Sequence, residues 1–169
     1  MTETTLCFPR RTRESTGESI EEVLLIEKRR GLGDGLYNGP GGKLEAGETP
    51  RECATRETRE EVDLEVDPAD LEKAGELTFL LDGERHSVCH VFRTRSFSGE
   101  PTTTAEARPT WTPVDDVPYD QMWDDDHLWL PGVLEGNTVV GDFHFEGGKP
   151  LDEAEFVEYD LKWNVSFDE

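Results

Sequence analysis

The sequence predicts an α/β fold of the α+β kind, in which a mixed β-sheet is covered by helices on both sides. Two observations predict it: seven short runs have the composition of β-strands, and two segments carry the boundary signals of helices. Because strands precede, separate and follow the two helices, we expect both faces of the sheet to be covered. The seven runs span residues 4–8, 22–27, 77–81, 87–97, 109–112, 139–145 and 155–163.

The first helix is predicted from residue 50 to about residue 62. Thr49 stands at its N-cap, Pro50 at its first position and Glu52 at its third, which together make a capping box. Its more apolar stripe, which we expect to pack on the sheet, consists of Ala54, Thr58 and Val62.

The second helix is predicted to begin near the acidic triplet of residues 124–126 and to end before Gly136, since carboxylates stabilise a helix N-terminus. Turn signals at residues 82–83 and 147–148 join neighbouring strands. Residues 10–22 are polar and lack hydrophobic periodicity, so they predict a surface loop. A length of 169 residues without internal repeats predicts a single domain over residues 1–169.

The composition is strongly acidic. Thirty-nine acidic residues against 17 basic ones give a net charge of −22, and the resulting field repels phosphate backbones and anionic membranes. We therefore expect neither a nucleic-acid polymer nor a membrane as partner. Most of these carboxylates, taken singly, indicate a solvated surface of the kind found in proteins from concentrated salt.

The three cysteines, Cys7, Cys53 and Cys89, are odd in number and irregularly spaced, which predicts neither a disulfide framework nor a zinc site. We expect them to be buried in a reducing compartment. No run approaches the roughly 18 apolar residues of a membrane span, and the polar start has no signal-peptide core. The expected location is the cytoplasm.

Three glutamates of the first predicted helix share one face. Glu57, Glu60 and Glu61 stand at i, i+3 and i+4, and like charges placed this way repel each other. A divalent cation among them would remove that cost, and hard oxygen ligands suit Mg²⁺, with Mn²⁺ as a possible substitute. The alternative is an acidic surface without metal.

A glycine-rich stretch, residues 38–43, precedes this helix and taken alone predicts only a turn. Its distance to the glutamates is more informative. A pattern over residues 42–64 resembles the Nudix box. It consists of Gly42, then five residues and Glu48, then seven residues and Arg56-Glu57, then two residues and Glu60-Glu61. Two positions depart from the family's pattern, Thr58 and Asp63. Asp tolerates the left-handed conformation usually taken by the glycine that ends this helix.

The resemblance implies the Nudix fold, a mixed curled sheet sandwiched between helices, and hydrolysis of a diphosphate linkage. The family's scheme implies that Glu57, Glu60 and Glu61 are metal ligands, joined by the carbonyl of Gly41. It implies an additional carboxylate from Glu106 and a brace between Arg56 and Glu48. A glutamate beside the metal is also the expected general base, with Glu61 preferred and Glu60 second.

From about residue 23 to residue 145 the chain further resembles the oxidised purine nucleoside triphosphatases, the 8-oxo-dGTP diphosphatases of this family. The matching stretches are VLLIEKRRGLGDGLYNGPGGKLEAGE, ARPTWTPVDDVPYDQMWDDDHLWLP and GDFHFEG. The resemblance implies that Asn38, Trp123, Asp125 and Asp126 hold the base. It also implies that Thr5, Lys28 and Leu32 line the pocket. Two adjacent carboxylates in a confined pocket do not both ionise readily, so one can donate while the other accepts.

The predicted function is therefore Mg²⁺-dependent hydrolysis of oxidised purine nucleoside triphosphates to monophosphate and pyrophosphate, by a monomer acting on a small nucleotide. One alternative retains the chemistry and changes the substrate to ADP-ribose, another dinucleotide or an ordinary nucleoside triphosphate. Another is a catalytically silent domain that only binds nucleotide or a protein partner. For the aspartates at residues 124–126, the alternative to a base-binding role is that they merely cap a helix.

Overall fold

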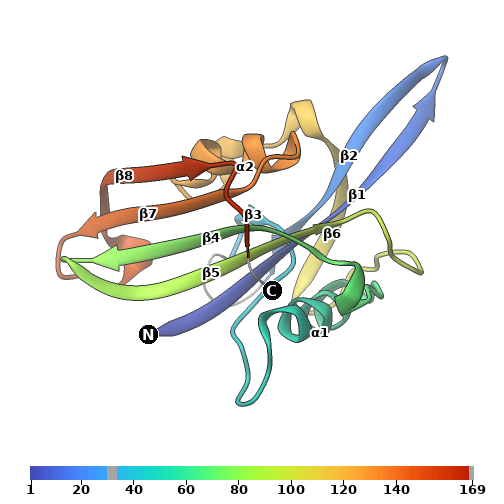
Figure 1. Ribbon diagram of the computed structural model, residues 1–169. Helices are drawn as coiled ribbons and strands as arrows, with labels where there is room; N and C mark the ends of the chain where they lie inside the picture. Colours follow the sequence, from blue (N-terminus) through green and yellow to red (C-terminus); the bar gives the residue numbers. More distant parts are fainter. Residues whose placement is uncertain (30–33, 168–169) are drawn as a thin grey trace.

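The computed structural model describes residues 1–29 and 34–167 (Figure 1). Within these residues the strands form one eight-stranded sheet in the order β3-β2-β1-β5-β4-β7-β8, and β6 pairs with β2. The strands are β1 (Thr2–Ser15), β2 (Glu18–Lys28), β3 (Tyr37–Asn38), β4 (Glu72–Leu81), β5 (Glu84–Thr94), β6 (Ala107–Pro113), β7 (Val139–Glu146) and β8 (Glu155–Trp163). The helices are α1 (Pro50–Val62) and α2 (Asp126–Leu134).

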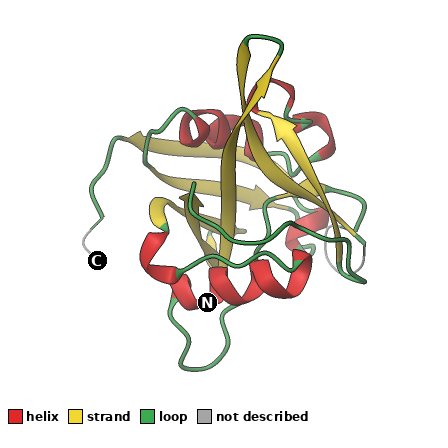
Figure 2. Cartoon of the chain, turned by 90° about the vertical axis from the view of Figure 1, so that its right-hand side faces the viewer, coloured by secondary structure: helices red, strands yellow, loops and turns green. Residues whose placement is uncertain are grey.

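Strand β1 is the reason that the sheet curls. Its first part, residues 2–9, runs parallel to β5, whereas residues 10–15 pair with β2 in antiparallel fashion. One long strand thus belongs to two sections of the sheet. The β1–β2 hairpin stands clear of the rest of the molecule in both views (Figures 1 and 2).

The two faces of the sheet bury different helices. Successive side chains of a strand point to opposite faces, so Cys7 and Phe8 of β1 lie on opposite sides. Cys7 packs with Ala54 of α1, while Phe8 packs with Trp129 of α2. The mixed sheet sandwiched between helices is therefore confirmed, with α1 and α2 on opposite sides in Figure 1.

Helix α1 has the predicted start and end. The Thr49 hydroxyl accepts a hydrogen bond from the Glu52 N–H, and the Glu52 carboxylate accepts one from the Thr49 N–H. Asp63 ends the helix at φ 60°, ψ 32°, in the left-handed region, as expected of the residue at this position. Thr58 is fully buried, and its hydroxyl donates to the Ala54 carbonyl at 2.8 Å.

The prediction of a surface loop over residues 10–22 was wrong, because these residues form the β1–β2 hairpin. Both faces of this ribbon are solvated, so it shows no apolar alternation. Instead Arg11 and its register partner Glu22 pair at 2.8 Å, and Arg13 adds a 3.2 Å contact to the same carboxylate. Thr16 and Gly17 make the turn at φ 48° and 82°, which matches a tight hairpin turn.

Other expectations hold. All seven predicted runs overlap observed strands, and helix α2 begins and ends where its signals placed it. The three cysteines are free and buried. In the described part of the chain no helix is both long and apolar enough to span a membrane.

Candidate active site

The glycine-rich loop runs beside β1 and pairs with it. The Cys7 N–H donates to the Pro40 carbonyl at 2.7 Å, and the Thr5 N–H donates to the Gly42 carbonyl at 2.8 Å. Because carbonyls alternate along an extended chain, the Gly41 carbonyl between them points away from β1. A Cβ at Gly41 would lie 1.9 Å from the Thr5 carbonyl oxygen, so only glycine allows this approach.

Two carboxylates of α1 contact this loop. Glu61 is 2% exposed and accepts a 2.9 Å hydrogen bond from the Gly41 N–H. Glu57 lies so close to Gly42 that a Cβ there would stand 2.6 Å from the Glu57 Cδ. The second glycine therefore leaves room for a carboxylate, and the loop and helix form one unit.

Arg56 connects the carboxylates to the preceding loop. Its Nε and Nη2 donate to the two oxygens of Glu48 at 2.7 and 2.9 Å, a bidentate pair, and Nη2 also donates to the Lys43 carbonyl. Its Nη1 contacts Glu57 at 2.7 Å and Glu60 at 3.1 Å. The Arg56 hydrogen bonds lower the pKa of Glu48 to about 2.

Several carboxylates crowd this site. Burial raises the pKa of Glu61 to about 8, with further contributions from Glu57 and Glu106, and burial also raises the pKa of Glu57. Glu60 lies at the edge, with its side chain 47% exposed.

The residues at this site fit a divalent cation in their chemistry. Within residues 1–29 and 34–167, no three acidic, histidine or cysteine side chains already stand in ligating positions, since Arg56 draws Glu57 and Glu60 toward itself. A divalent cation requires hard oxygen donors. This site offers carboxylates whose negative charge is only partly neutralised, beside the Gly41 carbonyl, which points away from β1.

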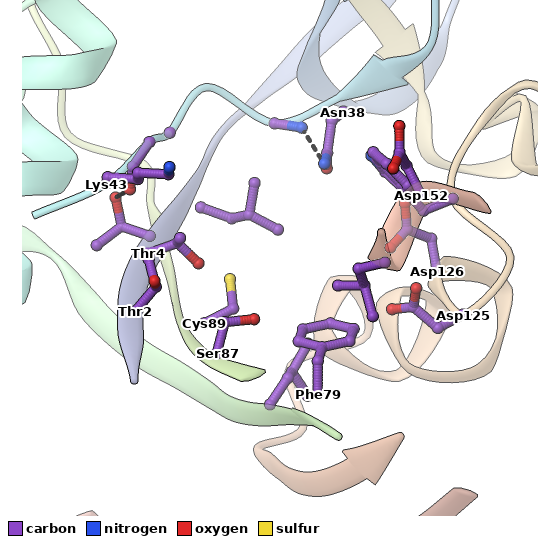
Figure 3. Close-up of a pocket in the computed structure, with 18 of the residues that line it drawn as sticks. Thr2, Thr4, Asn38, Lys43, Phe79, Ser87, Cys89, Asp125, Asp126 and Asp152 are labelled. Atoms are coloured by element: carbon purple, nitrogen blue, oxygen red, sulfur yellow. Dashed lines mark hydrogen bonds between the residues drawn. The ribbon is translucent and has the colours of Figure 1, made fainter. Parts of the chain in front are cut away.

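A cavity of about 500 Å³ begins at this end and extends under α2 (Figure 3). Its walls include Glu61, Gly41, Gly42, Lys28 and Lys43 at one end and Asn38, Trp123, Asp125 and Asp126 at the other. Two of the predicted metal residues, Gly41 and Glu61, therefore line one cavity with the predicted base residues, although they are far apart in the sequence. Glu57, Glu60 and Glu106 are not among the residues that line it.

The aspartate pair at the second end is buried. Asp125 and Asp126 are 4% and 3% exposed, whereas Asp124 is exposed, which shows which two of the three face the cavity. Asp125 Oδ2 accepts a 2.9 Å hydrogen bond from the Trp129 Nε1–H, and Asp126 Oδ2 is buried without a hydrogen-bond partner. Burial raises the pKa of both carboxyls, and for Asp126 the charge of Asp125 adds to the effect. Asp125, the N-cap residue, makes no side-chain capping bond, so capping does not account for the pair.

The other predicted pocket residues differ in their placement. Lys28, at the end of β2, lowers the pKa of Glu61 by its charge and so stands near it. The Asn38 Oδ1 accepts from the Gly39 N–H at 2.8 Å, which leaves the amide nitrogen available. Thr5 borders the cavity, but its hydroxyl lies 3.3 Å from the Cys53 sulfur, on the α1 side. Leu32 lies outside the described residues.

Several residues that line the cavity were not predicted from the sequence. They include the strand residues Thr2, Thr4, Phe79, Ser87 and Cys89, and Asp152 joins them from the short helix η4 (Leu151–Glu153). Alternation places Thr4 on the cavity face of β1 and Thr5 on the other, a one-residue distinction that only the known strand register reveals.

A curled sheet between two helices, with a glycine loop and an acidic helix at one end of a single cavity, defines a hydrolase of the Nudix type. The comparison with known protein families agrees, since the NUDIX domain matches residues 5–133. The chain belongs to the Nudix family. Nudix hydrolases generally use divalent metal ions, and a nucleotide substrate fits such a site.

Two relatives are similar over most of their length. The oxidized purine nucleoside triphosphate hydrolase of Danio rerio is 44% identical over 126 residues, which cover 74% of this chain and 80% of that protein. The protein of the same name from Mus musculus is 36% identical over 148 residues, or 87% and 90% of the two chains. The crystal structure of a mutator MutT protein from Bacillus halodurans has a TM-score of 0.70 at 24% identity, covers 95% of this chain and 97% of that one, and supports the fold alone.

Proposed function

We propose that this chain hydrolyses oxidised purine nucleoside triphosphates, 8-oxo-dGTP among them, to the monophosphate and pyrophosphate, and so cleans the nucleotide pool. The observation that carries this proposal is the buried Asp125–Asp126 pair in the same cavity as Glu61. The two relatives named for this activity support it.

The base end of the cavity suits a purine with altered hydrogen-bonding groups. A buried acceptor held by Trp129 stands beside a carboxyl whose Oδ2 has no partner, and the Asn38 amide nitrogen adds a donor. The protonated carboxyl of Asp126 can donate a hydrogen bond and the ionised carboxylate of Asp125 can accept one. The pair can therefore bind an edge of the purine that carries both an acceptor and a donor. Trp123 supplies an aromatic surface for the ring.

The phosphate end would hold Mg²⁺, with Mn²⁺ as a substitute, on the carboxylates of Glu57, Glu60, Glu61 and Glu106 and the Gly41 carbonyl. When bound, such a cation neutralises the polyphosphate charge and makes water a better nucleophile. Lys28 and Lys43, which border the cavity, add positive charge for the phosphates. Arg56, through its bidentate pair with Glu48, keeps the loop in place against α1.

In the hydrolysis, a water oxygen bonds to phosphorus while the P–O bond that bridges the α- and β-phosphates breaks, which gives the monophosphate and pyrophosphate. We assign the acceptance of the water's proton to Glu61, with Glu60 second. The assignment rests on position: Glu61 is buried and borders the cavity, whereas the Glu60 side chain is half exposed and turned toward Arg56.

The experiment compares pyrophosphate release from 8-oxo-dGTP and dGTP, and hydrolysis of ADP-ribose, with Mg²⁺ or Mn²⁺ in molar KCl. Wild type should prefer 8-oxo-dGTP, Asp125→Asn should lose that preference, and Glu61→Gln should lose turnover on every substrate. Equal rates on 8-oxo-dGTP and dGTP would point instead to an ordinary nucleoside triphosphate as substrate. Faster hydrolysis of ADP-ribose would favour that alternative, and an unaffected Glu61→Gln would remove the base assignment.

We further propose that residues 1–169 act as a single-domain monomer on free nucleotides in the cytoplasm. The charge of −22 supports the absence of nucleic-acid partners. Light scattering in molar KCl checks the monomer, and a gel-shift assay with DNA and RNA checks the absence of polymer binding.

A further inference from the structure

Three hydroxyl side chains lie on the floor of the cavity, between its two ends. Thr2 and Thr4 come from β1 and Ser87 from β5, and the parallel register sets Thr2 beside Ser87 and Thr4 beside Cys89. Figure 3 shows this group between Lys43 and the aspartate pair. Ser87 is only 7% exposed.

The chemistry of this face changes along the strands. Farther along the same face, Phe8 of β1 and Val91 of β5 are fully buried in the core formed with α2. In the part of this face that opens into the cavity, the hydroxyl side chains stand beside Leu6, Leu77 and Phe79. Of the three hydroxyl residues Ser87 is buried, Thr4 is half-buried and Thr2 is exposed at the rim of the cavity. A buried hydroxyl requires a hydrogen-bond partner, so Ser87 and Thr4 suit a ligand with polar groups.

The two neighbours of this floor identify the part of a nucleotide that would lie on it. Thr4 forms a bridge with Lys43, directly after Gly42, at the phosphate end. Cys89 and Ser87, beside Thr4 and Thr2, line the same cavity as Asp125 and Asp126 and lie on the way from Lys43 to that pair (Figure 3). The group between the base and the phosphates of any nucleotide is its sugar.

We propose that Thr2, Thr4 and Ser87 form a sugar subsite that binds the ribose hydroxyls and so makes the enzyme sensitive to the sugar of its substrate. This inference rests on the proposed function, because it assumes a base at the aspartate end. A hydroxyl can donate and accept at once, which matches a sugar hydroxyl. The Thr4 hydroxyl donates to the Val88 carbonyl at 3.4 Å, so toward a sugar it would act as an acceptor. The Ser87 Oγ lies 3.1 Å from the His86 Nδ1, which leaves it further hydrogen-bonding capacity.

The test compares three oxidised substrates that differ only in the sugar: 8-oxo-GTP, 8-oxo-dGTP and the 2′,3′-dideoxy analogue. Each sugar hydroxyl bound by the floor should raise kcat/KM about threefold to tenfold, the effect of one neutral hydrogen bond. In the Thr4→Val/Ser87→Ala double variant the ratio of kcat/KM for each hydroxyl-bearing substrate to kcat/KM for the dideoxy analogue should fall toward one.

Two further variants separate this role from a structural one. Thr4→Ser retains the hydroxyl and should retain the sugar preference. Thr78→Val, on β4 but on the face away from the cavity, removes a hydroxyl from the same sheet and should leave the preference unchanged. Circular dichroism in the assay buffer checks that each variant is folded.

Equal kcat/KM for all three sugars in wild type would overturn the subsite, as would an undiminished preference in the double variant. The same comparison with GTP, dGTP and ddGTP keeps the two proposals distinguishable. If oxidation of the base has no effect on rate but the sugar does, the proposed function fails while the sugar subsite stands.

Discussion

The indole N–H of Trp129 donates a 2.9 Å hydrogen bond to Oδ2 of Asp125, the N-cap residue of α2, one helical turn earlier. Trp129 is 1% exposed and makes an edge-on contact with Phe8 at 6.1 Å between ring centroids. A core residue thereby orients a carboxylate of the cavity. The bond also makes the aspartate pair asymmetric, since Asp126 Oδ2 has no such donor.

Replacing Trp129 should lower both the stability of the fold and the preference for the oxidised substrate. Trp129→Phe leaves a ring in the core but removes the N–H from a buried carboxylate, so we expect unfolding free energy to fall by about 1–3 kcal/mol. The preference for 8-oxo-dGTP over dGTP should fall as well. Urea unfolding and kcat/KM ratios measure the two effects. Trp111→Phe, near Arg11 at the surface, is the matched control; equal behaviour of both variants would contradict the role of Trp129.

The pair of Arg56 and Glu48 predicts a particular loss of stability in acid. The pKa of Glu48 is about 2 in the folded chain against an ordinary value of 4.5. A lowered pKa contributes stability that is complete above pH 4.5 and disappears as the pH falls toward 2. The stability of Glu48→Gln should therefore change less than that of wild type over this window. Urea unfolding at constant KCl checks it, and parallel curves would show that the pair adds nothing.

The two glycines of the loop should respond differently to alanine. At Gly41 the added Cβ meets the Thr5 backbone, which is held by the sheet, so Gly41→Ala should destabilise the protein by about 1–3 kcal/mol or more. At Gly42 the three nearest atoms that it meets belong to the Glu57 carboxylate, which can turn away. Gly42→Ala should thus remain stable within about 1 kcal/mol but lose activity about 100-fold, the effect of misplacing a reacting group. Melting curves and kcat separate the two; a stable, active Gly42→Ala would contradict the placement of Glu57.

The charge of −22 predicts that folding depends on salt. Raising KCl from about 0.1 M to about 1 M shortens the screening length from about 10 Å to about 3 Å, so the melting temperature should rise. Neutralising exposed carboxylates of β8, as in Glu155→Gln/Glu158→Gln, should reduce the slope. A melting temperature independent of KCl would show that the acidic surface does not limit stability.

Local signals in the sequence predicted α1 well. The capping box and the left-handed Asp63 depend on neighbouring residues only, and both have the expected geometry. The hairpin of residues 10–22 was missed for the opposite reason. Its cross-strand Arg11–Glu22 pair becomes visible only when the register is known, although the turn at Thr16–Gly17 was a signal that could have found it.

Local patterns predicted at least part of seven of the eight strands, the two helices, the Nudix box and the acidic face of α1, because the periodicity and the spacing along one chain segment specify them. Only the tertiary structure decided that Asp125 and Asp126, and not Asp124, are buried in the cavity that Glu61 borders. It also decided that Thr4 and Ser87 lie on the cavity floor between them. Burial and shared cavities depend on segments far apart in the chain, and the register of β1 against β5, which no local pattern encodes, brings those segments together.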